Sequence, residues 1–427
     1  MNRKLLPVLI FATLAGIPLP AQPANHEHWV TTWATSATLA RVDIPRAAPA
    51  NANPNANANA AANPARLIGT RGFTDQTVRM IVRASIGGHR LRVKLANAFG
   101  APAVEIGAAH IALQDKDSQI VAASDRPLLF NGKPKCTLGP GVALVSDPVD
   151  LTFAPLAYVT VSLYLPVETG PPNAHGTGLH TTYVSQGDAT AQPAIANPLV
   201  TTASYYWLSS IDVLAPAKAA AIVAFGDSIT DGAQSTVNTD HSWPALLAAR
   251  LARNPKTADI GVSNQGIGGN RVRRDITGVS ALGRFDRDVL GQSGVKWLML
   301  LEGINDIGHG ATDPTEKVTA EDIIGGYKQL IDAAHDHGIK VIGCTLTPYE
   351  GANYARPEGE AVREAVNNWI RTSHAFDAVV DFEAAVRDAA NPKHIRAEFD
   401  PGDHLHPNNA GYEAMANAID LTMFTRK

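Results

Sequence analysis

The sequence predicts an α/β fold with a parallel sheet, preceded by a separate β-sandwich region. The first part contains short runs in which apolar and polar residues alternate, for example at 78–86 and 91–95, and this period of two is typical of half-buried strands. From Ala219 onward, apolar runs alternate with amphipathic helical segments, which indicates a parallel sheet covered on both faces. The chain has 427 residues, which is long enough for two domains. We therefore expect one domain at 25–213 and another at 214–427.

The N-terminal segment has the pattern of a secretory signal peptide, expected to occupy residues 1–24. A basic start precedes an apolar stretch at 5–16, and a small, proline-rich exit follows at 18–24. Cleavage is expected after Ala21 or Ala24. A buried N-terminal helix fits poorly, because the positive start and the prolines bound the apolar stretch. The mature protein is therefore expected to be secreted or periplasmic.

Turn residues separate the strands expected in the first domain. The pair Gly87-Gly88 is expected to make a hairpin turn between the runs at 78–86 and 91–95, and a further alternating run spans 159–165. Short alternating strands with turns between them indicate a β-sandwich of jelly-roll type. An Ala/Asn/Pro-rich stretch at 47–64 lacks an apolar pattern, and we interpret it as a disordered insertion.

The second domain alternates expected strands with expected helices. The strands are apolar runs at 220–225, 295–301, 340–346 and 378–382. Four helical faces are indicated by apolar residues that recur with a period of 3.6. These residues are Trp243, Leu246, Leu247 and Leu251; Ile323, Ile324, Tyr327, Leu330, Ile331 and Ala334; Val362, Val366, Trp369 and Ile370; and Tyr412, Met415, Ala416 and Ile419.

Polar motifs lie where the expected strands end. Ser228 follows the first strand and the segment 303–306 follows the second, at the sheet edge where α/β proteins bind ligands. A glycine-rich loop at 264–270 offers backbone N–H groups that can approach a substrate closely. Asp403 and His406 are three residues apart, so the carboxylate can orient the imidazole as a general base. A nucleophile, a base and its orienting group are therefore all available for attack on an ester.

In four motifs the chain resembles the SGNH (GDSL) hydrolase family. One of these motifs, Asn-x-Gly-x-x-Gly at 264–269, departs slightly from the family pattern, because Gly266 stands where many relatives have alanine. This difference removes no backbone donor. The resemblance covers the C-terminal half from end to end and does not extend to 28–210, although extracellular members with an N-terminal β-domain are similar in layout. The motifs occur in the family's order, as Gly-Asp-Ser at 226–228, Asn-x-Gly-x-x-Gly at 264–269, Gly-x-Asn-Asp at 303–306 and Asp-x-x-His-Pro at 403–407.

The resemblance implies a flavodoxin-like three-layer fold and a serine mechanism. It implies that Ser228 is the nucleophile, His406 the general base and Asp403 its carboxylate partner. The oxyanion donors would be the backbone N–H groups of Ser228 and Gly269 and the side-chain amide of Asn305. Such donors stabilise the charge that develops on the carbonyl oxygen during attack.

Each of these residues also has a purely structural interpretation when it is taken alone. Ser228 could cap a helix, His406 could lie on the surface, Asn305 could form a turn and Gly269 could be a hinge. Their joint occurrence in one order favours catalysis. Asp227 is expected to be a turn or helix-start residue and not a second acid.

Two other hydrolase chemistries lack support in the sequence. The Gly-x-Ser-x-Gly elbow is absent around Ser228. His175, His180, His404 and His406 are candidate metal ligands by type, but no His-Glu-x-x-His or Cys-x-x-Cys spacing accompanies them. We therefore expect no metal and no cofactor, and His404 is expected to form a wall of the site.

Composition excludes several kinds of partner. The net charge is −4 and the Lys and Arg residues are dispersed, which gives no case for nucleic acid. An apolar content of 45% and a charged content of 18% fit a soluble globular protein. No interior run is long enough for a stable membrane insertion. Cys136 and Cys344 form no disulfide framework, and two free thiols are favoured over an interdomain bridge.

These observations predict a secreted serine ester hydrolase. Export and the added β-domain favour an acetylated polysaccharide or oligosaccharide, such as acetylxylan, as the ester substrate. A short-chain aryl or lipid ester, including a lysophospholipid, is the alternative substrate, and a non-catalytic glycan-binding protein is the alternative function. Tyr205, Tyr206 and Trp207 could stack on sugar rings, but core packing at the domain junction is favoured. The oligomeric state is not predicted.

Overall fold

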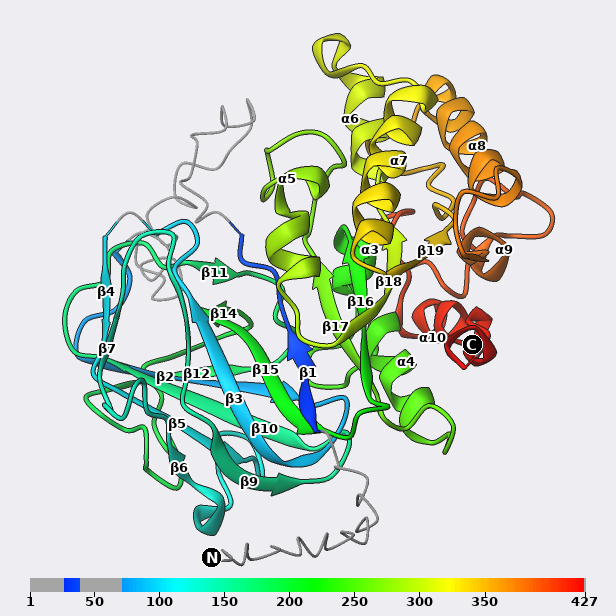
Figure 1. Ribbon diagram of the computed structural model, residues 1–427. Coiled ribbons are helices and arrows are strands. Elements are labelled where there is room, and N and C mark those ends of the chain that lie inside the picture. Colours follow the sequence, from blue (N-terminus) through cyan, green and yellow to red (C-terminus); the bar gives the residue numbers. More distant parts are fainter. Residues whose placement is uncertain (1–26, 39–70, 101, 426–427) are drawn as a thin grey trace, which may run out of the picture.

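The computed structural model describes residues 27–38, 71–100 and 102–425. The expected signal peptide at 1–24 and the expected insertion at 47–64 lie outside these residues. Figure 1 shows a β-rich region beside an α/β region. The last strand of the first region ends at Ala215 and the first strand of the second begins at Ala220. The connection therefore lies at 216–219, slightly beyond the boundary expected after residue 213.

The β-rich region consists mainly of two antiparallel sheets. The first has the spatial order β1 (His28–Ala34), β15 (Leu208–Ala215), β3 (Gly88–Ala96) and β8 (Ala143–Val145), and β9 (Val149–Phe153) also pairs with β3. The second has the order β13 (Val200–Thr202), β12 (Thr182–Gln186), β2 (Gln76–Arg83), β10 (Tyr158–Leu165), β5 (Ala108–Leu113) and β6 (Arg126–Pro127). Two separate two-stranded sheets complete the β-rich region. They pair β11 (Ala174–His175) with β14 (Tyr205–Tyr206) and β4 (Val104–Ile106) with β7 (Cys136–Leu138).

Apolar residues of both sheets meet in one core. The inward residues of β2 and β3 belong to the same buried cluster, as their alternation predicts. These residues are Val78, Met80 and Val82 on β2 and Leu91, Val93 and Leu95 on β3. A β-rich N-terminal region is therefore present, and its jelly-roll identity stays a prediction.

The hairpin expected at Gly87-Gly88 is wrong. β2 pairs with β10 and β12, whereas β3 pairs with β15, β8 and β9, so the chain crosses from one sheet to the other between them. A Cβ on Gly87 would lie 2.4 Å from the carbonyl oxygen of Phe153. The glycine therefore allows a close approach to the backbone around Phe153, rather than forming a two-residue turn.

The α/β region contains one five-stranded parallel sheet. Its spatial order is β17 (Ile260–Gly266), β16 (Ala220–Gly226), β18 (Val295–Leu301), β19 (Lys340–Cys344) and β20 (Ala378–Val380). Numbered along the chain this is 2-1-3-4-5, which is the flavodoxin-like order. The four expected strands are all present, and β17 is an additional edge strand that the sequence did not predict.

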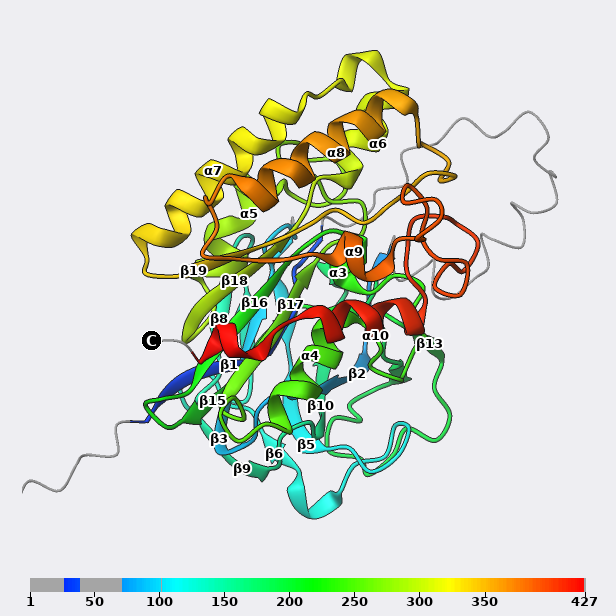
Figure 2. The ribbon, with the colours of Figure 1, turned by 90° about the vertical axis from the view of Figure 1, so that its right-hand side faces the viewer.

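Helices cover both faces of this sheet. Figure 2 shows α7 and α8 on one side of it and α4 and α10 on the other. The helices are α3 (Ser228–Asp231), α4 (Trp243–Ala252), α5 (Ala281–Phe285), α6 (Ile304–Thr312), α7 (Ala320–Asp336), α8 (Pro357–Thr372), α9 (Phe382–Val386) and α10 (Asn409–Ala418). Single helical turns lie at Ala122–Ser124, Asp286–Leu290, Pro314–Glu316 and Leu421–Phe424. The four predicted helical faces correspond to α4, α7, α8 and α10.

The β-rich region covers the exposed edge of the parallel sheet. A Cβ on Gly261 of β17 would lie 2.5 Å from the carbonyl oxygen of Thr31 on β1, so only glycine permits this approach. The backbone N–H of Val262 donates to the hydroxyl of Ser85 at 2.9 Å. An uncovered edge strand invites pairing with other chains, and these contacts from the first domain close it off.

Two further expectations about side chains can be compared with the structure. Tyr205, Tyr206 and Trp207 are buried in the β-rich core, which agrees with packing and not with exposed stacking on a sugar. Cys136 and Cys344 are both free thiols, as expected. Among the described residues, no helix is both long enough and apolar enough to cross a membrane.

Candidate active site

Ser228, His406 and Asp403 form a continuous chain of hydrogen bonds. Ser228 is the first residue of α3, directly after β16, and its Oγ lies 2.8 Å from Nε2 of His406. Nδ1 of His406 lies 2.7 Å from Oδ2 of Asp403. A carboxylate at Nδ1 favours the tautomer with its proton on that nitrogen, which leaves Nε2 free to accept the hydroxyl proton of Ser228.

The loop that carries Asp403 holds this carboxylate in its ionised form. Its Oδ1 accepts the backbone N–H groups of Leu405 at 3.0 Å and His406 at 2.9 Å. Burial pushes the pKa of Asp403 upward, but its hydrogen bonds to His406 and to this backbone outweigh burial and hold the pKa below its ordinary value. The group that orients His406 is therefore a carboxylate at neutral pH.

Asp227 caps the helix that Ser228 begins. Its Oδ1 accepts the N–H of Ile229 at 2.9 Å, which satisfies one of the free donors of the first turn. This agrees with the helix-start role expected for Asp227. The backbone N–H of Ser228 lies in the first turn of the same helix. Backbone donors of a first turn have no hydrogen-bond acceptor within the helix.

Asn305 is oriented by two hydrogen bonds. It lies in the first turn of α6, just after β18, and its Nδ2 donates to the carbonyl of Asn270 at 3.0 Å. Its Oδ1 accepts the hydroxyl of Tyr354 at 3.2 Å. Since an amide nitrogen carries two hydrogens, one Nδ2–H remains for a ligand. The sequence did not predict Tyr354, because nothing in the pattern links residue 354 to Asn305.

Gly269 lies in the loop after β17 with a left-handed backbone. Its φ is +78°, and an added Cβ would lie 3.0 Å from the Thr277 side chain. Glycine adopts this conformation without the steric cost that other residues incur. The first residues of the predicted 264–270 loop belong to β17, so the loop itself begins only after Gly266.

Arg284 connects the structural elements beneath these groups. It is fully buried and donates to the carbonyls of Gly226 at 2.9 Å and Gln265 at 2.7 Å, at the ends of β16 and β17. Its Nε donates at 3.0 Å to the side chain of Asn270, whose backbone carbonyl in turn holds Asn305. A buried arginine of this kind has no local sequence signature, since its partners come from distant segments.

Three buried carboxyl groups, those of Asp227, Glu302 and Asp306, lie near the turn that carries Ser228. Burial, reinforced by Asp306, raises the pKa of Asp227 to about 7. Burial also raises the pKa of Asp306 to about 6, and burial together with Asp227 raises the pKa of Glu302 well above its ordinary value. The negative charge near Ser228 is therefore lower than three ionised carboxylates would give.

The loop between α3 and α4, residues 232–242, links Asp403 to the β-rich region. Gln234 Nε2 donates to Oδ2 of Asp403 at 3.2 Å. At the other end of this α3–α4 loop, Asp240 accepts from Nε2 of His180 at 2.9 Å and from the hydroxyl of Tyr158. Asn238 accepts the N–H of Thr181 at 2.8 Å.

Three non-glycine residues of the α3–α4 loop have left-handed backbone, Gln234 at φ +68°, Asn238 at +64° and Asp240 at +55°. Such conformations cost of order 1 kcal/mol in non-glycine residues and persist where surrounding contacts hold them. The side-chain contacts of the loop provide that support.

The four histidines considered as metal ligands each pair with a different aspartate. His175 contacts Asp231, His180 contacts Asp240, His404 contacts Asp400 and His406 contacts Asp403. His404 is 46% exposed and packs against Gly351, and its ion-pair partner Asp400 lies outside the Ser228 hydrogen-bond chain. Within residues 27–38, 71–100 and 102–425, no group of three His, Cys, Asp or Glu side chains is placed to hold a metal ion.

Comparison with known proteins identifies the C-terminal region. Residues 224–414 match the model of the GDSL-like Lipase/Acylhydrolase family. This region contains all four motifs and the whole Ser228–His406–Asp403 chain. The C-terminal domain is therefore an acylhydrolase domain of the GDSL (SGNH) type, and the protein is a carboxylic ester hydrolase of this type.

Solved structures also resemble part of the chain. A lipolytic protein of the G-D-S-L family from Desulfitobacterium hafniense is 24% identical and covers 48% of this chain and 99% of its own, with a TM-score of 0.35. An acetyl xylan esterase is 20% identical over 46% of this chain and 96% of its own, with a TM-score of 0.36. An acetylxylan esterase from Geobacillus stearothermophilus is 22% identical over 47% and 91%, with a TM-score of 0.36. No curated protein matches the chain.

Proposed function

We propose that Ser228, His406 and Asp403 hydrolyse the ester bond as a catalytic triad. The observation that carries this proposal is the 2.8 Å contact from Ser228 Oγ to His406 Nε2, continued by the 2.7 Å contact from His406 Nδ1 to Asp403. Ser228 Oγ bonds to the carbonyl carbon while its proton passes to His406 Nε2. Asp403 stabilises the imidazolium that results.

The acyl-enzyme then forms in one step and is hydrolysed in a second. Collapse of the tetrahedral intermediate breaks the bond to the alcohol, which leaves with the proton held by His406. A water molecule gives a proton to His406 and its oxygen bonds to the acyl carbon. The second collapse releases the carboxylic acid and returns the proton from His406 to Ser228.

We assign the oxyanion to three donors, the N–H groups of Ser228 and Gly269 and the side-chain amide of Asn305. The free N–H of a first helical turn, the left-handed backbone of Gly269 and the remaining Nδ2–H of Asn305 support this assignment. Removing one such donor raises the barrier by roughly 3 to 4 kcal/mol in enzymes with comparable sites.

The substrate that we favour is an acetylated polysaccharide or oligosaccharide such as acetylxylan. The signal-peptide pattern and a β-rich domain that packs along the edge of the catalytic domain support an extracellular carbohydrate ester. A short-chain aryl or lipid ester, including a lysophospholipid, is the second candidate, since family membership leaves the alcohol open.

Two measurements test the proposal. Purified protein should hydrolyse p-nitrophenyl acetate, which a non-catalytic glycan-binding protein would leave intact. Acetate release from acetylated xylan is then compared with fatty-acid release from a lysophospholipid at equal enzyme concentration. Faster acetate release supports the carbohydrate ester, and faster fatty-acid release overturns that part of the proposal while leaving the serine mechanism standing.

A further inference from the structure

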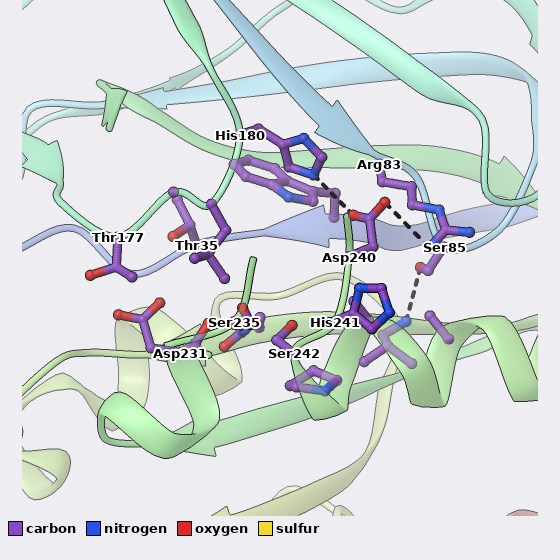
Figure 3. Close-up of a pocket in the computed structure, with 18 of the residues that line it drawn as sticks. Thr35, Arg83, Ser85, Thr177, His180, Asp231, Ser235, Asp240, His241 and Ser242 are labelled. Carbon is purple, nitrogen blue, oxygen red and sulfur yellow. Dashed lines mark hydrogen bonds and ion pairs between the residues drawn. The ribbon is translucent and has the colours of Figure 1, made fainter. Parts of the chain in front are cut away.

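A pocket opens at the junction of the two domains, apart from the Ser228 triad. Its walls come from β1, the end of β2 and loop 177–180 on one side, and from Asp231, the α3–α4 loop and α4 on the other. Figure 3 shows Thr177 of the β-rich domain lying across from Asp231 at the end of α3. The pocket has a volume of about 90 Å³. Since one water needs roughly 10–15 Å³ on this measure, the pocket has room for a small organic molecule.

Both carboxylates of the pocket contact basic side chains within its walls. Asp240 contacts His180 at 2.9 Å and Arg83 at 3.5 Å, as Figure 3 shows. Asp231 contacts His175 at 3.0 Å through Oδ1, and its buried Oδ2 has no hydrogen-bond partner among the described residues, which leaves one acceptor for a ligand hydroxyl. A bound cation would have to compete with these partners for the two carboxylates, and a bound anion would lie close to the same carboxylates. The pairing therefore favours a neutral ligand over a cation or an anion.

The uncharged wall combines hydroxyl groups with apolar surface. Thr35, Thr177 and Ser242 contribute hydroxyls, and Ala245 and Ala248 of α4 contribute apolar surface. The half-buried Trp33 adds an aromatic ring, held in an edge-to-face contact with Tyr205 at 4.9 Å. A sugar ring has apolar C–H faces and a rim of hydroxyls, so it can use both kinds of surface at once.

We propose that this pocket binds one neutral pyranose unit of a carbohydrate. The inference goes beyond the proposed catalytic function, because the binding requires neither Ser228 nor turnover. It gives the β-rich domain a role in holding a sugar, since that domain supplies Trp33, Thr35 and Thr177 to the wall.

The position of the pocket also relates it to the triad. Its lining includes Ser235 and Thr236 of the α3–α4 loop, between Gln234, which contacts Asp403, and Asp240, which contacts His180. The hydroxyl of Thr236 accepts a hydrogen bond at 2.9 Å from the side-chain amide of Asn409, which follows His406 closely in the sequence. A sugar in the pocket would therefore contact the segment that supports the catalytic carboxylate.

Calorimetry and saturation-transfer NMR with the full mature protein test this site. The probes are xylose and xylobiose, with sodium acetate as an anionic probe and cyclohexanol as an apolar probe of ring size. Saturable binding of the sugars at millimolar concentration, retained in Ser228→Ala, is the expected result. Absence of sugar binding overturns the proposal, and so does binding of acetate or cyclohexanol in preference to the sugars.

Matched variants locate the binding. Ala245→Leu places a larger side chain in the pocket and should weaken sugar binding at least tenfold. Ala252→Leu makes the same change at another half-buried position of α4 that does not line the pocket, and should leave binding unchanged. Thr177→Val removes one hydroxyl with little change of shape and should weaken binding severalfold, which keeps the test open if Ala245→Leu fails to fold.

These binding results are separable from the catalytic proposal. If sugars bind but Ser228→Ala retains full esterase activity, the triad assignment fails and the pocket assignment stands. If the esterase activity depends on Ser228 but sugar binding is unaffected by both Ala245→Leu and Thr177→Val, the pocket assignment fails alone.

Discussion

Gln234 donates a hydrogen bond to the same oxygen of Asp403 that contacts Nδ1 of His406. The two distances to Oδ2 are 3.2 Å from Gln234 Nε2 and 2.7 Å from His406. Gln234 belongs to a loop whose far end is held by His180 of the β-rich domain through Asp240. Asp403 is therefore connected to the first domain through a loop with left-handed residues.

This connection predicts that Gln234 positions Asp403. Gln234→Asn shortens the side chain by one methylene, so the amide no longer reaches Asp403, and asparagine tolerates the left-handed backbone. The acceptor is a carboxylate, but the bond is long at 3.2 Å and Gln234 is exposed, so we expect its loss to cost only about 0.5 to 1.5 kcal/mol. The kcat for p-nitrophenyl acetate should therefore fall roughly 2- to 10-fold with KM unchanged. The control is Gln186→Asn, where another exposed glutamine donates to Asp75 far from the triad. If both variants had the same kcat as the wild type, Gln234 would have no role in positioning Asp403.

Tyr354 is predicted to fix the orientation of the Asn305 amide. Tyr354→Phe deletes the hydroxyl that Oδ1 of Asn305 accepts, so the amide can rotate away from the oxyanion. We expect kcat to fall roughly 3- to 10-fold while KM stays within a factor of two, because the donor acts in the transition state. Tyr349→Phe makes the same change at a neighbouring buried ring, 6.0 Å away, whose hydroxyl is not the one bonded to Asn305. An unchanged kcat in Tyr354→Phe, or an equal loss in Tyr349→Phe, contradicts this role.

Asn305→Ala tests the proposed role of Asn305 as an oxyanion donor. The substitution removes the Nδ2–H groups and should lower kcat by about 100- to 1000-fold, with little change in KM. Steady-state kinetics with p-nitrophenyl acetate measure both constants. A rise in KM at unchanged kcat would make Asn305 a substrate-binding residue and not an oxyanion donor.

Asp227 makes the stability of the fold depend on pH. Burial, together with Asp306, raises its pKa from 3.8 to about 7 in the folded protein. Between these two values the folded state keeps a proton that the unfolded chain has lost, so stability falls as the pH rises from about 4 to 7. Asp227→Asn keeps a capping residue and removes this titration. The variant should therefore lose less stability than the wild type between pH 5 and pH 8, by up to about 2.5 kcal/mol, which is about 1.36 kcal/mol for each pH unit between 5 and 7.

Urea unfolding at pH 5, 6.5 and 8 measures this difference. The control is Asp313→Asn, the same change at an exposed cap whose carboxyl has a pKa lowered by its hydrogen bonds to Thr315. Because its pKa is lowered on folding, Asp313 makes the protein more stable as the pH rises, not less. Its replacement should therefore not flatten the fall in stability between pH 5 and pH 8. Parallel stability curves for Asp227→Asn and the wild type would show that Asp227 is not protonated in the folded protein.

Local patterns predicted much of the fold and the four candidate-site motifs. Apolar runs such as 295–301 become strands because they fill a core on both faces of a parallel sheet. The residues of the site could be found because Ser228, Gly269 and Asn305 each follow the end of a strand, where a short motif is enough to identify them.

Long-range packing accounts for what the sequence did not predict. Alternation at β2 and β3 indicates which faces are buried but not which strands pair, so two strands of different sheets resembled a hairpin. β17 was missed because Gly261 and Ser263 interrupt its apolar residues, and Gly261 is needed where Thr31 of the other domain approaches. Gln234, Tyr354 and Arg284 act through partners distant in sequence, which no local period reveals.

Labelling of Ser228 is the most direct test of the proposed mechanism. A serine-reactive fluorophosphonate, followed by peptide mass spectrometry, should modify Ser228 and no other serine, because only this hydroxyl is proposed to be activated by His406. Ser228→Ala should abolish both the label and the hydrolysis of p-nitrophenyl acetate, while circular dichroism and the unfolding midpoint stay close to those of the wild type. A label on another serine, or turnover near the wild-type rate in Ser228→Ala, would contradict the assignment of Ser228 as the nucleophile.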